Sequence, residues 1–163
     1  MARVILASVE WVVSIRTAVP AEAPILDDLH RRSSFVWAED RPALEANPDV
    51  FGVSRAGISD ERVRVAAGAT GEILGFASTS KNADGDCELD DLFVDPAVMR
   101  RGIGRSLVED AARRARLDGC RSLTVVAHRR NFPFYESVGF VVEEPVATRF
   151  GPAFSLRRAL YGG

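Results

Sequence analysis

The sequence predicts a single α/β domain, an α+β mixed sheet with helices on its faces. Segments 62–67 and 72–80 alternate or run apolar, as neighbouring antiparallel strands do. Segments 87–94 and 122–127 enclose a helical pattern, which is typical of a right-handed parallel βαβ unit. The 163 residues, 47% of them hydrophobic, suffice for one domain with its own core.

The N-terminal part predicts one strand and two helices. Residues 13–18 alternate as a strand before Pro20. Apolar residues at helical spacing predict a helix over 21–35, with Pro24 in its first turn, where proline is tolerated. A short helix is expected over 41–46, because Pro48 disfavours its continuation. Residues 52–60 read as turn-rich.

The middle of the chain predicts the βαβ unit. The turn-forming segment KNADGD at 81–86 leads to a third strand at 87–94. An apolar stripe beginning at Ile103 predicts a helix over 103–118, and Gly119 suits its C-terminal cap. The almost wholly apolar segment 122–127 is typical of a buried central strand.

The C-terminal part predicts a short helix over 131–137 and strands that begin at 139–142 and cover 153–160. The domain is therefore expected over 13–161. Residues 1–12 are expected to be a flexible leader, because chain ends are commonly poorly ordered.

Charge and composition exclude several classes. The net charge of −2 argues against a nucleic-acid binder. Glu10 interrupts the apolar start, so neither a signal peptide nor a membrane span is expected, and the protein is predicted to be cytoplasmic. Cys87 and Cys120 form no CxxC pair and do not cluster with the histidines, so we expect buried free thiols and no metal site.

The stretch MRRGIGRSL, residues 99–107, combines glycines, arginines and the start of the predicted helix. A helix N-terminus has free N–H groups and a partial positive charge, so it suits an anionic ligand. The alternative is a tight strand-to-helix connection with solvated arginines. A dinucleotide fingerprint fails because Leu107 stands at its third glycine, and the P-loop pattern GxxxxGK[ST] is absent.

Two motifs together resemble the GCN5-related N-acetyltransferase (GNAT) family. Gly102-Ile103-Gly104 matches the second half of the family's pyrophosphate loop, [QR]xxGx[GA], although Met99 departs from its first position. Downstream, FYESVGF at 134–140 matches a second family signature at the usual spacing. The resemblance covers about residues 14–161 and implies the GNAT fold, in which two splayed parallel strands, here 87–94 and 122–127, receive acetyl-CoA.

The resemblance implies which residues hold acetyl-CoA, with no metal required. The pantetheine arm would pair with the exposed backbone of the first splayed strand, near its end. The pyrophosphate would meet amides and side chains of the glycine loop. The residues implied are Phe93, Val94, Arg100, Arg101, Gly102, Ile103, Gly104, Arg105, Ser106, Asn131, Phe134 and Tyr135. Asn131 has the alternative role of capping the short helix.

Acetyl transfer to an amine needs a base, an oxyanion donor and an acid for the leaving thiolate. The resemblance assigns the acid to Tyr135, whose alternative role is packing, and the oxyanion donor to the N–H of Val94 or Phe93. Glu88 is the candidate base, directly or through water; a water chain without a dedicated base is the rival. Strand alternation places Glu88 and Asp90 on one face unless a bulge intervenes.

The acceptor side is expected to involve Phe35, Trp37, Asp40 and Asp90, because aromatic residues and acids suit an amine. The predicted function is therefore N-acetylation of a small-molecule or peptide amine. A non-catalytic acyl-CoA sensor of the same fold is the alternative, and a different acyl donor is a third. Homodimers are common in this family.

Overall fold

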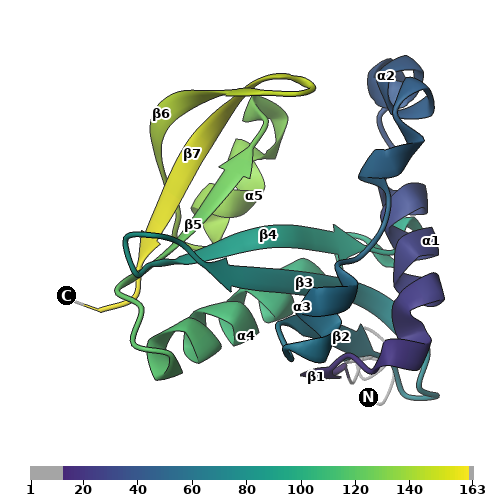
Figure 1. Ribbon diagram of the computed structural model, residues 1–163, viewed down its shortest axis with the longest axis horizontal. Helices are drawn as coiled ribbons and strands as arrows, with labels where there is room; N and C mark the ends of the chain where they lie inside the picture. The colour runs from purple at the N-terminus through teal and green to yellow at the C-terminus, as the bar shows by residue number, and fades with distance from the viewer. Residues whose placement is uncertain (1–12, 162–163) are drawn as a thin grey trace, which may run out of the picture.

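The computed structural model describes residues 13–161, which form a seven-stranded mixed sheet in the order β1-β2-β3-β4-β5-β7-β6 (Figure 1). The predicted leader, 1–12, lies outside the described residues. The strands are β1 (Ser14–Thr17), β2 (Val63–Ala67), β3 (Ile73–Lys81), β4 (Cys87–Val94), β5 (Ser122–Ala127), β6 (Val141–Thr148) and β7 (Gly151–Ala159). The predicted fold class is confirmed, and the bounds of β4 and β5 match the predicted ones.

The helices cover the two faces of the sheet, each over its own core. The α-helices are α1 (Ala23–Ser34), α2 (Arg41–Ala46), α3 (Arg55–Ser59), α4 (Ile103–Leu117) and α5 (Phe132–Ser137). Residues of α1 and α3, including the fully buried Leu26 and Leu29, form one core with β2 and Phe76 of β3. The other core joins α4 and α5 to the opposite face (Figure 1). No helix within residues 13–161 is long and apolar enough to cross a membrane.

The parallel strands β4 and β5 pair only near their starts, at Cys87 with Leu123 and Glu88 with Thr124. Beyond these pairs β4 stays with β3, and β5 pairs with β7 along its whole length. The two strands therefore diverge, as Figure 1 shows, and leave backbone groups at the end of β4 without a strand partner on the β5 side.

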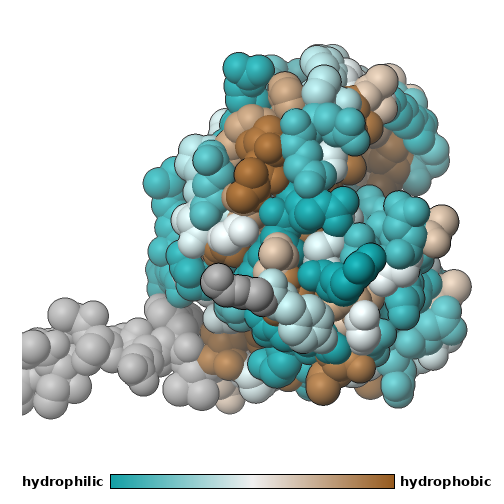
Figure 2. Space-filling model, turned by 90° about the vertical axis from the view of Figure 1, so that its left-hand side faces the viewer, coloured by the Kyte–Doolittle hydropathy of each residue, from teal (hydrophilic) through white to brown (hydrophobic). Residues whose placement is uncertain are grey.

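The strand β6 is the edge strand of the sheet on the side that Figure 2 shows. Hydrophilic side chains prevail on this face, with hydrophobic ones in its upper part and along its lower edge. Glu143, Glu144 and Pro145 stand where the β6–β7 register shifts. Charges, a proline and a register shift all disfavour pairing with a further strand, so this edge is protected.

Two expectations were wrong. The turn-rich segment 52–60 contains the helix α3, because the Ser54 hydroxyl accepts the Gly57 N–H and caps its start. Cys87 and Cys120 are not free thiols: they form a disulfide, with Cα atoms 5.8 Å apart. The end of α4 brings Cys120 beside the first residue of β4, a proximity that spacing along the sequence cannot indicate.

Candidate functional site

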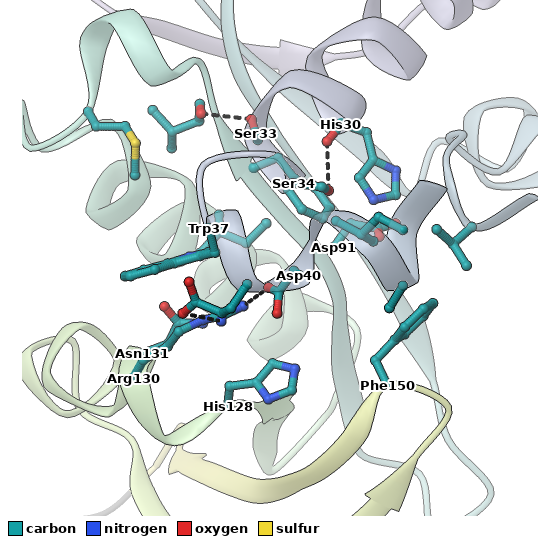
Figure 3. A pocket seen from close by; sticks show the side chains of 18 of the residues that line it. His30, Ser33, Ser34, Trp37, Asp40, Asp91, His128, Arg130, Asn131 and Phe150 are labelled. Atoms are coloured by element: carbon teal, nitrogen blue, oxygen red, sulfur yellow. Dashed lines mark hydrogen bonds and ion pairs between the residues drawn. The ribbon is translucent and has the colours of Figure 1, made fainter. Parts of the chain in front are cut away.

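A cavity of about 670 Å³ lies where α1 and the segment after it meet the ends of β4 and β5 (Figure 3). Three of the four predicted acceptor residues line it: Trp37, Asp40 and Asp90. The predicted coenzyme residues Phe93, Val94 and Asn131 line it too. The splayed strands thus open directly into a space large enough for a small substrate.

The backbone at the end of β4 is divided between two sides. Asp95 donates its N–H to Leu74 of β3 at 2.8 Å, and Val94 lies opposite Gly75 in the register. By strand alternation the main-chain groups of Phe93 point toward β3, whereas those of Val94 point away from it. The Val94 carbonyl accepts a hydrogen bond from the Ser33 hydroxyl of α1 at 2.9 Å. Of the two predicted oxyanion donors, this geometry favours the N–H of Val94.

A β-bulge brings two neighbouring carboxylates into the cavity wall. Asp91 pairs with Ser78 and Leu89 with Thr79, so Asp90 is an extra residue on β4. Asp90 and Asp91 both line the cavity, although adjacent residues of a regular strand face opposite sides. The Ser80 hydroxyl donates to Asp90 at 3.0 Å, and that of Ser78 donates to Asp91 at 2.5 Å. Each carboxylate is held through one of its oxygens.

Glu88 lies at the last β4–β5 pair, opposite Thr124, where the two strands begin to diverge. Its neighbours Cys87 and Leu89 belong to the core under α4, so alternation directs Glu88 to the other face of the sheet. Burial, followed by the charge of Asp90, raises the pKa of its carboxyl above the ordinary value. Glu88 is not among the residues that line the cavity.

Tyr135 is 9% exposed and packs its ring edge-to-face against Phe134 and Phe140. Burial raises the pKa of its hydroxyl to about 12, so the group keeps its proton at neutral pH. Like Glu88, Tyr135 does not line the cavity. Its helix α5 belongs to the core on the α4 face.

The glycine loop has the geometry of an anion site. Gly102, at φ +85°, precedes the first residue of α4, and Arg100 also has a positive φ of +64°. Ser106 donates its N–H to Gly102 at 3.0 Å, so the amides of Ile103, Gly104 and Arg105 precede the first intrahelical bond. A Cβ added at Gly102 would meet nothing within 4 Å, so the amides are open to a ligand.

Two side chains of this loop are already engaged. The Ser106 hydroxyl donates to the Gly102 carbonyl at 3.0 Å, and Arg105 reaches the Ser137 carbonyl at 3.1 Å. A Cβ at Gly104 would lie 3.2 Å from the ring of Phe134, which packs against the start of α4. These contacts leave the backbone amides as the principal donors of the loop.

The donor set fits acetyl-CoA. A run of amides at a helix N-terminus suits a pyrophosphate, and the end of β4, which has no strand partner on the β5 side, suits the amide-bearing pantetheine arm. The thioester end would then lie at the cavity. The start of α4, the end of β4 and the cavity would thus receive the pyrophosphate, the pantetheine arm and the thioester, in that order along the coenzyme.

Other predicted residues have different surroundings. Phe35 does not line the cavity: its ring lies 5.4 Å from that of Phe51 and 5.0 Å from the Arg41 guanidinium. Asn131 precedes α5 without a side-chain capping bond, so the capping alternative is wrong, and its side chain lies in the cavity wall (Figure 3).

Sequence reasoning missed several residues of the cavity, among them Ser33, Arg130 and His30. Arg130 bridges it by ion-pairing with Asp40 and, at 3.7 Å, with Glu39, while its guanidinium lies over the Trp37 ring. His30 of α1 packs its ring against Phe93. Both contacts join segments far apart in the sequence, and no local pattern signals them.

Comparison with known proteins identifies the fold. The sequence model described as "Acetyltransferase (GNAT) family" matches residues 23–140. Glucosamine 6-phosphate N-acetyltransferase of Trypanosoma brucei brucei is 29% identical over 114 residues, which cover 62% of this chain and 78% of that protein.

Solved structures show the same architecture. The PaiA N-acetyltransferase of Thermoplasma acidophilum, solved in complex with coenzyme A, has a TM-score of 0.72 at 21% identity, covering 90% of this chain and 98% of its own. The ribosomal-protein-S18-alanine N-acetyltransferase of Escherichia coli has a TM-score of 0.67 at 20% identity, covering 93% and 96%.

Proposed function

The chain belongs to the GNAT acetyltransferase family, and we propose that it transfers the acetyl group of acetyl-CoA directly to a primary amine of a small molecule or peptide. The observation that carries this proposal is the course of β4. The strand separates from β5, directs the main chain of Val94 away from β3, and ends at a cavity lined by carboxylates. The proposed place of action is the cytoplasm.

Acetyl-CoA supplies the acetyl group as a thioester. The amides at the start of α4 hold its pyrophosphate, and the Val94 N–H donates to the carbonyl oxygen as negative charge develops there. The Ser33 hydroxyl fixes the Val94 carbonyl, which lies across the Val94 Cα from this N–H, so the position of Val94 is restrained before the substrate arrives.

Two ionisable residues move the protons. Glu88, whose raised pKa makes it a stronger base than an ordinary carboxylate, accepts the proton of the amine directly or through water. Tyr135, protonated at neutral pH, donates to the departing sulfur. Neither side chain lines the cavity. The thioester sulfur is therefore proposed to reach Tyr135 at the opening between β4 and β5. A water molecule is proposed to carry the proton from the amine to Glu88.

The acceptor is an amine that enters between Trp37 and the Asp90–Asp91 wall. The T. brucei relative is named for glucosamine 6-phosphate, which makes amino sugars natural first candidates. Free amino groups of small molecules or peptides fit the same chemistry.

Replacing each tyrosine in turn tests the proposed acid. Tyr135→Phe should lower kcat for CoA release by about 10²-fold or more while leaving the Kd for acetyl-CoA within about twofold. Tyr161→Phe is the matched control, since the Tyr161 hydroxyl bonds the Arg116 carbonyl on the exposed surface. Unchanged kcat in Tyr135→Phe would assign Tyr135 to packing, and coenzyme binding without amine-dependent CoA release would favour a sensor.

A further inference from the structure

His30 presents one polar atom to the acceptor cavity. The side chain is 9% exposed and lines the cavity from α1 (Figure 3). Its ring lies 4.2 Å from that of Phe93 and 5.7 Å from that of Phe51, so packing fixes its orientation. A buried, rigid and polar side chain in a cavity wall is suited to recognising a ligand.

The tautomer of His30 follows from the single hydrogen bond that its ring makes within the described residues. Its Nδ1 accepts the Gly52 N–H at 3.2 Å, so the neutral ring carries its proton on Nε2. Burial lowers the pKa of the imidazole, more than the charges of Asp91 and Asp27 raise it, so the ring is neutral at pH 7. With its basic nitrogen occupied, His30 is a hydrogen-bond donor toward the cavity and does not act as a base.

Asp91 supplies the complementary group. Its charge acts on His30, and Ser78 occupies one of its carboxylate oxygens, leaving the other for a ligand. The wall thus offers an N–H donor beside a carboxylate acceptor. An amine with a neutral oxygen near the nitrogen satisfies both, because the oxygen accepts from Nε2 and the ammonium donates to Asp91.

The same wall disfavours anions. Four carboxylates line the cavity: Glu39, Asp40, Asp90 and Asp91. Among the described lining residues, Arg130 is the single arginine or lysine, and its guanidinium already pairs with Asp40 and Glu39. A phosphate or carboxylate on the acceptor would meet repulsion without a partner.

We propose that His30 and Asp91 determine acceptor specificity, selecting amines that carry a neutral hydroxyl or carbonyl oxygen near the nitrogen and no anionic group. This inference rests on the proposed acetyl transfer. It distinguishes this protein from the T. brucei relative named for glucosamine 6-phosphate, because the selected class includes an amino sugar without its phosphate and excludes the phosphate.

Three amines test the selection: glucosamine, glucosamine 6-phosphate and cyclohexylamine, which lacks the hydroxyls. The readout is kcat/KM for CoA release from acetyl-CoA. Glucosamine should exceed each of the others by about tenfold or more, since one hydrogen bond to a charged or buried group is worth about that factor.

Variants assign the preference to the two side chains. His30→Asn keeps an acceptor at the δ position for Gly52 but removes the Nε2 donor, so glucosamine should fall to within about threefold of cyclohexylamine. His30→Gln, which keeps a donor at the ε position, should restore part of the difference. Asp91→Asn should lower kcat/KM for glucosamine by about tenfold and reduce the ratio of kcat/KM for glucosamine to that for glucosamine 6-phosphate. Asp84→Asn, the same charge change in the exposed β3–β4 turn, should do neither.

The possible outcomes distinguish a failure of the proposed acceptor selection from a failure of the proposed acetyl transfer. Four results would overturn the proposed selection and leave acetyl transfer intact. They are a higher kcat/KM for glucosamine 6-phosphate than for glucosamine, an equal kcat/KM for cyclohexylamine, acetylation of other amines but not of glucosamine, and variants in which the order of the three acceptors is unchanged. The absence of amine-dependent CoA release with every amine tested would overturn both. Melting temperatures of the variants, measured in parallel, identify any loss that comes from unfolding.

Discussion

The Ser33 hydroxyl donates a hydrogen bond of 2.9 Å to the main-chain carbonyl of Val94, and so joins α1 to the end of β4. The bond spans 61 residues of sequence and anchors the Val94–Asp95 peptide, which adjoins the Phe93–Val94 peptide that carries the proposed oxyanion donor, the Val94 N–H. In the proposed mechanism, the helix that forms one wall of the cavity therefore also restrains the residue that donates to the reacting carbonyl.

Ser33→Ala tests this connection. Losing the bond should cost about 1 kcal/mol of stability and lower kcat by about tenfold, because Val94, and with it the adjoining N–H, is no longer anchored to α1. Ser54→Ala is the control: it removes the cap of α3, with a similar loss of stability, and lies outside the cavity lining. Equal kcat in the two variants at matched folded fractions would contradict the positioning role.

The glycine loop is tested by a pair of glycines at the two ends of α4. Gly102 and Gly119 have φ of +85° and +80°, and at both a new Cβ would meet nothing within 4 Å. Alanine at either position should therefore cost about 1–2 kcal/mol of stability through backbone strain. Only Gly102→Ala should also raise the Kd for acetyl-CoA, measured by calorimetry, by about tenfold or more. Equal Kd values for acetyl-CoA in the Gly102→Ala and Gly119→Ala variants would show that this loop does not bind the pyrophosphate.

Glu88 should show a trade between stability and activity. Its pKa is raised in the folded state, so the folded protein binds this proton more tightly than the unfolded chain does. Stability from this group is then full below the unfolded pKa and lost as the pH rises through the folded value. Glu88→Gln should accordingly raise Tm at pH 7 relative to wild type, and leave Tm nearly unchanged at low pH.

The same substitution should alter the pH–rate profile. As a base, Glu88 must be ionised, so wild-type kcat/KM should fall as the pH drops through its raised pKa. In Glu88→Gln the rate should be lower and this acid limb should disappear. A variant that keeps both the rate and the acid limb would favour a water chain without a dedicated base.

The disulfide gives a prediction about stability alone. Cys87 and Cys120 close a loop with a sequence separation of 33 residues, and such a link typically contributes about 3 kcal/mol. Reduction should lower Tm by about 10 °C for a chain of this size. The Cys87→Ser, Cys120→Ser double variant should show the lower Tm with or without reductant. If reductant does not move the wild-type Tm, the two thiols are not joined in solution.

The elements that sequence predicts best are those with clear boundary signals or an apolar run. The strands 87–94 and 122–127 were predicted with their observed bounds, because the turn segment 81–86 precedes the first, Asp95-Pro96 ends it, and the second is almost wholly apolar. The helix α3 was missed because glycine and serine read as turn residues, although Ser54 is its cap.

Some residues of the candidate site could be predicted from the sequence and others could not. The glycine loop carries a local signal, glycines and arginines before an apolar helical stripe, although a plain strand-to-helix turn gives the same signal and only the second motif at 134–140 separates the two. The bulge at Asp90 carries none: whether Asp91 faces the cavity depends on how β4 pairs with β3, which alternation alone cannot give. His30 and Arg130 have their roles through contacts with distant segments, and the Cys87–Cys120 pair depends on where α4 ends in space.

The central claim, acetyl transfer from acetyl-CoA to an amine, is tested most directly by following free CoA with pooled amines, amino sugars and peptides as acceptors. The account predicts CoA release that requires an amine, yields the N-acetylated amine in equal amount, and falls by about 10²-fold in Tyr135→Phe. Acetyl-CoA that binds but is not consumed with any acceptor, or that does not bind at all, would contradict it.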